Sequence, residues 1–270
     1  MSVKICPPPL SNEVYSVLQQ NLFAQPLNVA EWYAHLRSGS VINTSLQIHH
    51  LHPELQALLN SKTDLKNCGI DLPVWFGDLN SEQRLLIVAL DPKRNQTVTE
   101  ITLGSVFSLH TSEGRSTRRN NYWNFIEPLT KQGFVYITDI FKIYYEARDS
   151  TKGKTLLSNK DLTHINPEAP SGKLYKSILE KEIALVRPTR IITLGNEAAS
   201  VIKKIRNIRT SNLNYLDSTA EYIFLPHISN TVTQNIKTIG NLFLGIGLIK
   251  RDESLRKIGL DILDNREYLF

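Results

Sequence analysis

Four short runs of apolar and β-branched residues constrain the fold of this chain more than any other feature of its sequence. Each run stops at a polar residue or a chain-breaking residue, and the four span Leu85–Pro92, Gly133–Asp139, Arg190–Gly195 and Tyr222–His227. Uninterrupted apolar runs of this length are typical of strands that are buried on both faces of a parallel sheet. The sequence therefore predicts a parallel sheet built from these four strands.

Segments in which apolar residues recur at helical spacing lie between the predicted strands and after the last of them. The clearest of them run over residues 174–186, 197–206 and about 235–249. Strands that alternate with helices indicate a parallel sheet with helices on both faces. We therefore predict an α/β fold, a three-layer α/β/α sandwich around a central, four-stranded, mainly parallel sheet.

The first part of the chain has a different character, because residues 1 to about 80 are predicted to be mostly helical and carry no obvious chemistry. Asn28 is a candidate helix cap, and residues 51–59 form a short amphipathic segment. We predict an N-terminal helical extension over residues 1–71, packed on a core domain over residues 72–270.

Composition and charge place limits on the class of protein. The 270 residues can bury a sizeable core, and the net charge of +5 hints at an acidic partner such as nucleic acid. Cys6 and Cys68 form no C-x-x-C pair, which favours a reducing, cytoplasmic location. The proline-broken N-terminus does not resemble a signal peptide, and no apolar run reaches the ~20 residues of a membrane span.

Three polar side chains come at the ends of predicted strands. Ligands bind beyond the carboxyl ends of parallel strands, so we expect Asp91, Asp139 and His227 to lie on one rim of the sheet. A carboxylate there can position water or stabilise positive charge, and an imidazole can donate to a developing oxyanion. Taken singly, Asp91 is also explained as a turn residue before a proline, and His227 as a structural histidine.

The order of the motifs resembles that of the uracil-DNA glycosylase superfamily over roughly residues 72 to 250. In that family the first strand ends in a motif such as G-Q-D-P-Y, a stacking phenylalanine follows in an F-S context, and the second strand reads V-Y-I-T-N-x-x-K. The third strand reads I-V-x-L-G-x-x-A, and the last motif is H-P-S. The matching segments here are Ala89–Lys93, Phe107–Ser108, Val135–Lys142, Ile191–Ala198 and His227–Ser229.

The resemblance implies a monofunctional DNA glycosylase that flips a pyrimidine out of DNA, hydrolyses its N-glycosidic bond and leaves an abasic site. Asp91 would position water and stabilise the oxocarbenium-like sugar, and His227 would hydrogen-bond O2 of the departing base. Phe107 would stack on the base and Asp139 would read its Watson–Crick edge. The substrate-binding set that the resemblance implies is completed by Leu90, Lys93 and Asn196.

The resemblance also implies contacts with DNA. Ser229 and Asn230 would contact phosphate, and Thr231 or Val232 takes the place of the wedge that fills the hole left by the flipped base. A basic cluster with Arg115, Arg118 and Arg119 either binds phosphates or forms a solvated surface. We expect a monomer with DNA as partner and without cofactor, metal or membrane contact. Adjacent histidines at positions 49, 50 and 52 are more often exposed than ligands.

Two departures from the family pattern bear on the substrate. Asp139 replaces an asparagine, and an ionised carboxylate only accepts hydrogen bonds, which suits the amino group of cytosine better than O4 of uracil. Lys93 replaces a tyrosine that excludes C5 substituents. Both favour a C5-modified cytosine, such as the glucosylated hydroxymethylcytosine of phage DNA, and hence antiviral defence. The alternatives are a uracil-DNA glycosylase of base-excision repair, a non-catalytic DNA-binding protein and, less favoured, a small-ligand-binding protein.

Overall fold

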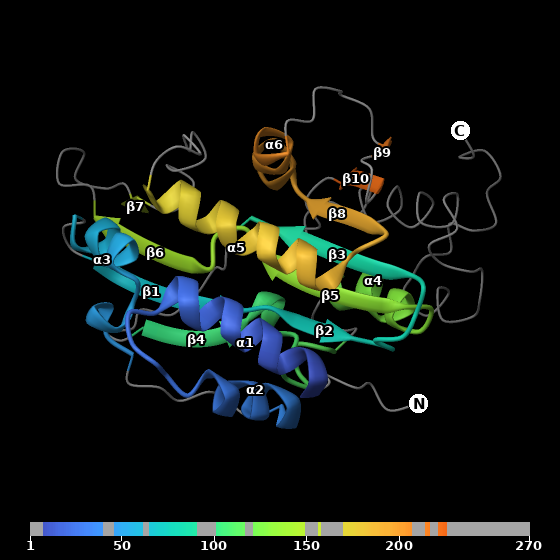
Figure 1. Ribbon diagram of the computed structural model, residues 1–270, viewed down its shortest axis with the longest axis horizontal. Coiled ribbons are helices and arrows are strands. Elements are labelled where there is room, and N and C mark those ends of the chain that lie inside the picture. Colours follow the sequence, from blue (N-terminus) through green and yellow to red (C-terminus); the bar gives the residue numbers. More distant parts are fainter. Residues whose placement is uncertain are drawn as a thin grey trace.

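A six-stranded sheet forms the centre of the computed structural model, which describes residues 8–39, 46–61, 65–90, 101–116, 121–148, 156–157, 170–206, 214–216 and 221–225. Within these residues the strand order is β2-β5-β3-β8-β10-β9 (Figure 1). The strands are β2 (Val74–Phe76), β5 (Phe134–Asp139), β3 (Arg84–Ala89), β8 (Arg190–Leu194), β10 (Glu221–Leu225) and β9 (Asn214–Leu216).

The four inner strands are the four that the apolar runs predict, and all of them run parallel. Their last residues lie side by side, because Ala89 of β3 pairs with Asp139 of β5 and Leu194 of β8 pairs with Leu225 of β10. The two edge strands, β2 and β9, are antiparallel to their neighbours. The carboxyl ends of the inner strands therefore form one rim, as predicted.

Helices cover both faces of this sheet, which confirms the three-layer α/β/α fold. The helix α5 (Pro170–Val186) crosses the front of the sheet in Figure 1, with α1 (Pro8–Leu22) beside it. The helix α4 (Asn121–Thr130) packs on β5, and α6 (Asn196–Ile205) packs on β8 and β10. Within the described part of the chain, no helix is long and apolar enough to cross a membrane.

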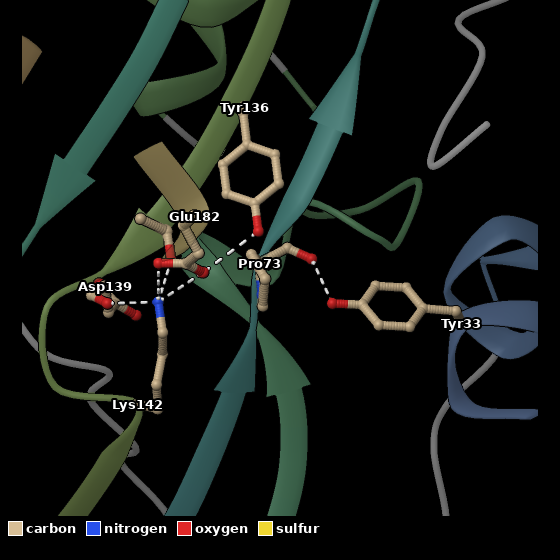
Figure 2. Close-up of polar contacts among 7 residues, drawn as sticks. Tyr33, Pro73, Tyr136, Asp139, Lys142 and Glu182 are labelled. Carbon is tan, nitrogen blue, oxygen red and sulfur yellow. Dashed lines mark hydrogen bonds and ion pairs between the residues drawn. The ribbon is translucent and has the colours of Figure 1, made fainter. Parts of the chain in front are cut away.

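The N-terminal residues form the predicted helices. They are α1, α2 (Val29–Ser38), the 3₁₀ turn η1 (Ile48–His50) and α3 (Pro53–Asn60). Asn28 caps α2 as predicted, since its side-chain oxygen accepts a hydrogen bond of 3.2 Å from the backbone N–H of Glu31. The Tyr33 hydroxyl of α2 donates to the carbonyl oxygen of Pro73 at 3.3 Å, which ties this region to the start of β2 (Figure 2).

A second sheet, which the sequence does not predict, joins the N-terminal region to later parts of the chain. Its strands, in spatial order, are β4 (Ile101–Ser105), β1 (Leu65–Leu72), β6 (Ile143–Arg148) and β7 (Leu156–Leu157). The strand β1 runs parallel to β4 and antiparallel to β6. The expectation of a mainly helical N-terminal region therefore omits β1, whose pairing partners lie far away in the sequence. The proposed boundary between residues 71 and 72 falls inside this strand.

We expect Gly77→Ala to lower the free energy of unfolding by about 2–4 kcal/mol. Gly77 follows β2 with a φ of 87°, and a Cβ at this position would lie 2.1 Å from the carbonyl oxygen of Gly133. Urea denaturation of the full chain measures the effect, with Ser81→Ala in the same turn as the control. A Gly77→Ala protein as stable as the wild type would contradict the close approach of these two backbone segments.

Candidate active site

The described residues include five of the predicted site residues: Leu90, Phe107, Arg115, Asp139 and Asn196. The other predicted site residues lie outside the described part of the chain. They are the predicted catalytic pair Asp91 and His227, the predicted base contact Lys93, and the predicted DNA contacts Arg118, Arg119, Ser229, Asn230, Thr231 and Val232.

Asp139 is the last residue of β5 and lies at the rim of the sheet with only 1% of its surface exposed. The turn that follows is tied to the end of β3, because the backbone N–H groups of Ile140 and Phe141 donate to the carbonyl oxygens of Ala89 and Leu90 at 3.0 and 2.9 Å. Leu90 directly precedes the predicted catalytic aspartate. The ends of these two strands therefore hold Leu90 and Asp139 next to each other.

A buried ion pair fixes the end of β5 from the α5 side (Figure 2). The Lys142 ammonium group lies 2.8 and 2.9 Å from the two carboxylate oxygens of Glu182 in α5, and both side chains are 1% exposed. The same ammonium group donates to the carbonyl oxygen of Asp139 at 2.7 Å and to the hydroxyl of Thr138. Lys142 thus binds the backbone of the residue whose side chain is expected to read the base.

The strand itself completes this network. The hydroxyls of Tyr136 and Thr138 both donate to Oε1 of Glu182, at 3.1 and 2.9 Å (Figure 2). Successive side chains of a strand point to opposite faces, so these two residues face α5 and Asp139 faces the other side of the sheet. The hydrogen bonds of the ion pair therefore link α5 to Tyr136, Thr138 and Asp139 near the end of β5.

Tyr122, in the first turn of α4, lies near Asp139 on that other side. Burial and, next, the negative charge of Asp139 raise the pKa of Tyr122 to about 12. The phenol is therefore protonated at neutral pH. The helix α4 that carries Tyr122 packs on β5.

Phe107 stacks on Tyr122 with ring centroids 3.7 Å apart and ring planes inclined by only 6°. Phe107 lies in the 3₁₀ turn η2 (Val106–Ser108) and has a φ of 54°, and Ser108 beside it has a φ of 56°. Left-handed conformations are uncommon for residues other than glycine and persist only where the surroundings enforce them. The surroundings of this turn therefore hold Phe107 and Ser108 in their strained conformations.

Hydrogen bonds inside the same loop hold the strained turn. The Ser105 hydroxyl and Nδ1 of His110 share a hydrogen bond of 2.7 Å, and the His110 backbone N–H donates to the same hydroxyl at 3.1 Å. Nη1 of Arg115 donates to the carbonyl oxygens of Leu109 and His110 at 2.7 and 2.8 Å. Arg115, predicted as a phosphate contact, therefore also supports the loop that carries Phe107.

Asn196 is exposed at the start of α6, directly after β8. Gly195 before it has a φ of 97°, and its backbone N–H donates to the carbonyl oxygen of Leu225 at 2.8 Å. This bond ties the ends of β8 and β10, so Asn196 lies on the same rim as Leu90 and Asp139. The structure thus brings the four described members of the predicted substrate-binding set, which are Leu90, Asp139, Asn196 and Phe107, to one side of the sheet.

The model of the family described as "Uracil DNA glycosylase superfamily" matches residues 76–245. The chain belongs to the uracil DNA glycosylase superfamily. Among solved structures, it is similar to the crystal structure of wild-type Pedobacter heparinus SMUG2, with 12% sequence identity, a TM-score of 0.41 and coverage of 88% of this chain and 98% of that chain. A search of the curated proteins finds no match.

As a member of the uracil DNA glycosylase superfamily, the chain is a DNA glycosylase, an enzyme that hydrolyses the N-glycosidic bond between a base and its sugar, and DNA is its partner. The family, the fold class and the enzyme class predicted from the sequence are therefore confirmed.

Four side chains around the candidate site were not singled out in the sequence. Lys142 ends a motif of the superfamily but had no role assigned to it, and a lysine inside a buried apolar stretch is itself a signal. Glu182 likewise falls among the buried positions of α5. Tyr122 and His110 give no local signal, because only the folded chain brings them to Phe107 and Ser105.

Two histidines of the N-terminal region, His50 and His52, stabilise the local backbone of this glycosylase. Nδ1 of His50 accepts a hydrogen bond of 3.0 Å from the backbone N–H of Gln47, and Nδ1 of His52 accepts one of 3.3 Å from that of Glu54. A search of the described ranges finds no group of three or more histidine, cysteine, aspartate or glutamate residues placed to hold a metal ion.

We expect Lys142→Met to lower the free energy of unfolding by about 3–5 kcal/mol, because it leaves the Glu182 carboxylate buried without its counter-ion. Urea denaturation measures this loss. The matched control is the double variant Lys142→Met/Glu182→Gln, which removes both charges and keeps an acceptor for Tyr136 and Thr138. We expect the double variant to be more stable than Lys142→Met alone. A double variant that is less stable than the single one would contradict the charge argument.

Proposed function

We propose that this DNA glycosylase excises a C5-modified cytosine, such as the glucosylated hydroxymethylcytosine of phage DNA, and that it acts in defence against viruses. The observation that carries the proposal is the carboxylate of Asp139, buried at the end of β5 where the superfamily reads the edge of the base. The buried Lys142–Glu182 pair holds the backbone at this position.

The chemistry of Asp139 favours cytosine over uracil. An ionised carboxylate offers only acceptors, and position 4 of cytosine carries an amino donor whereas position 4 of uracil carries a carbonyl acceptor. Asp139 would therefore bind the cytosine edge and repel that of uracil. A protonated Asp139 could instead donate to N3 of the ring.

The C5 substituent is the second part of the proposal. Lys93 stands where the strictest uracil enzymes have a tyrosine that closes the C5 face of the base. A flexible lysine excludes C5 substituents less effectively. An enzyme that removed ordinary cytosine would attack host DNA, so a modified base is the safer target. Phage DNA contains such bases, which suggests a defence role in the cytoplasm.

The proposed reaction begins when the target base leaves the helix, because a stacked base hides its glycosidic bond. Asp91 would then position water and stabilise the oxocarbenium-like sugar. His227 would donate to O2 of the departing base, where one such donor is worth about 3 kcal/mol in the transition state. The product is an abasic site without a covalent enzyme intermediate.

We propose the remaining roles on the same basis. Phe107, Leu90, Lys93 and Asn196 would line the base site, with Phe107 stacking on the base. The DNA contacts would be Ser229, Asn230, the wedge at Thr231 or Val232, and the arginines at positions 115, 118 and 119. The enzyme would act as a monomer without cofactor, with residues 1–71 as an extension packed on the catalytic domain of residues 72–270.

We expect the wild-type protein to release modified cytosine but not uracil, and Asp139→Asn to reverse this preference, because an asparagine amide can donate to O4. Discrimination at one base edge of this kind is worth about 1–3 kcal/mol, so the ratio of the two rates should change by roughly 10- to 100-fold. Mass spectrometry of bases freed from oligonucleotides with uracil, cytosine, hydroxymethylcytosine or its glucosylated form measures the preference. Release of uracil alone by the wild type would support base-excision repair instead.

We expect Asp91→Ala to lower the rate of abasic-site formation by at least roughly 100-fold while DNA binding persists. Alkaline cleavage of the treated DNA reports the abasic sites, and a gel shift reports binding. The control is Asp78→Ala, an exposed aspartate at the opposite end of the sheet. A wild type that shifts DNA but leaves no abasic sites would favour a non-catalytic DNA-binding protein.

A further inference from the structure

One face of the Phe107 ring is already covered by another ring. Tyr122 stacks on it at 3.7 Å with the two planes almost parallel, which is the geometry in which a nucleobase stacks on an aromatic side chain. Both side chains are half-buried, so the stack lies at the surface of the site and not in the core.

Tyr122 also resembles a bound base in its polar neighbour, which is Asp139. A base stacked on Phe107 would present its polar edge to Asp139. The Tyr122 phenol lies close enough to Asp139 for the charge of the carboxylate to act on it. The side chain therefore combines the same ring partner and the same polar neighbour that the target base is expected to have.

We propose that, in the DNA-free protein, Tyr122 occupies the place on Phe107 that the target base takes, and that it leaves this place when the base enters. The inference rests on the proposed base-stacking role of Phe107. It assigns Tyr122 to the base site, a role that neither the motifs nor the family match gives it.

The structure indicates which of the two rings moves. Phe107 lies in a loop that is held by the hydrogen bond between Ser105 and His110 and by Arg115. Tyr122 is the second residue of α4, in the turn where backbone N–H groups have no partner within the helix, and we take its ring to be the one that moves. Trp123 packs edge-to-face on Phe76 with ring centroids 5.2 Å apart and holds the rest of α4 in place.

Displacement of Tyr122 has a measurable consequence for affinity. A site that is competent only in a fraction of the molecules binds with an apparent affinity reduced by that fraction. Removal of the Tyr122 ring should therefore tighten binding of the base by roughly three- to tenfold, the factor that corresponds to one aromatic stack. If Tyr122 instead supports Phe107 from behind, its removal weakens binding, so the sign of the change decides between the two arrangements.

The test compares three single-stranded oligonucleotides that the enzyme cannot cleave. Two carry one 2′-fluoroarabino nucleotide, with either 5-hydroxymethylcytosine or uracil as the base, and the third carries a tetrahydrofuran abasic analogue. Fluorescence anisotropy measures the dissociation constants. We expect Tyr122→Ala to tighten binding of the base-bearing oligonucleotide that the wild type prefers, and to leave the abasic oligonucleotide unchanged.

Three further variants make the outcome specific. Tyr122→Leu fills much of the volume without a ring and should behave like Tyr122→Ala, whereas Tyr122→Phe keeps the ring and should behave like the wild type. Tyr15→Ala, at a half-buried tyrosine in α1, is the matched control and should change neither constant. Binding that is unchanged or weakened in both Tyr122→Ala and Tyr122→Leu overturns the proposal.

Phe107→Ala separates this inference from the proposed function. If Phe107→Ala weakens binding of the base-bearing oligonucleotide while the Tyr122 variants do not tighten it, the role of Tyr122 is wrong and the base site stands. If Phe107→Ala has no effect on any of the three oligonucleotides, the proposed base site is itself wrong, and the inference about Tyr122 falls with it.

Discussion

The pairing of Lys142 with Glu182 is the interaction on which the geometry of the site depends. Removing two charges from water is costly, and the cost is recovered only when every polar atom of the pair finds a partner. The partners here are the hydroxyls of Tyr136 and Thr138 and the backbone carbonyl of Asp139. The hydrogen bonds that satisfy the ion pair therefore fix the end of β5 and the orientation of its last residue at the rim. A buried charge that is expensive in itself sets the position of a residue expected to read the base.

The rest of the site is built from elements that are distant in the sequence and rigid for separate reasons. The ends of β3 and β5 are joined by backbone hydrogen bonds, and the ends of β8 and β10 are joined through Gly195. The strained turn at Phe107 is held by bonds within its own loop. Groups that are already oriented before the substrate arrives do not need to reorganise when charge develops on the reacting atoms. The free-energy cost of reorganisation is therefore avoided.

Local patterns explain what could be predicted from the sequence. The four inner strands were found because each is a contiguous apolar run. Asp139 was singled out because it ends such a run, and Phe107 because it lies in a short motif of the family. Non-local contacts explain what was missed. The strand β1 is specified by its pairing with β4 and β6, Lys142 and Glu182 are 40 residues apart, and the stack on Phe107 exists only after α4 has packed. The bonds of Arg115 to loop carbonyls were also missed, because they depend on a loop shape that composition does not reveal.

The position of β1 in the second sheet shows how the N-terminal residues support the rest of the enzyme. This strand is bonded on both sides, to β4 just before the Phe107 turn and to β6 just after Lys142. A protein shortened at residue 71 would lose almost all of it, and β4 and β6 would each present an unsatisfied row of backbone groups. Open edges of this kind recruit other chains. The amino-terminal segment thus supplies the strand that covers these two edges.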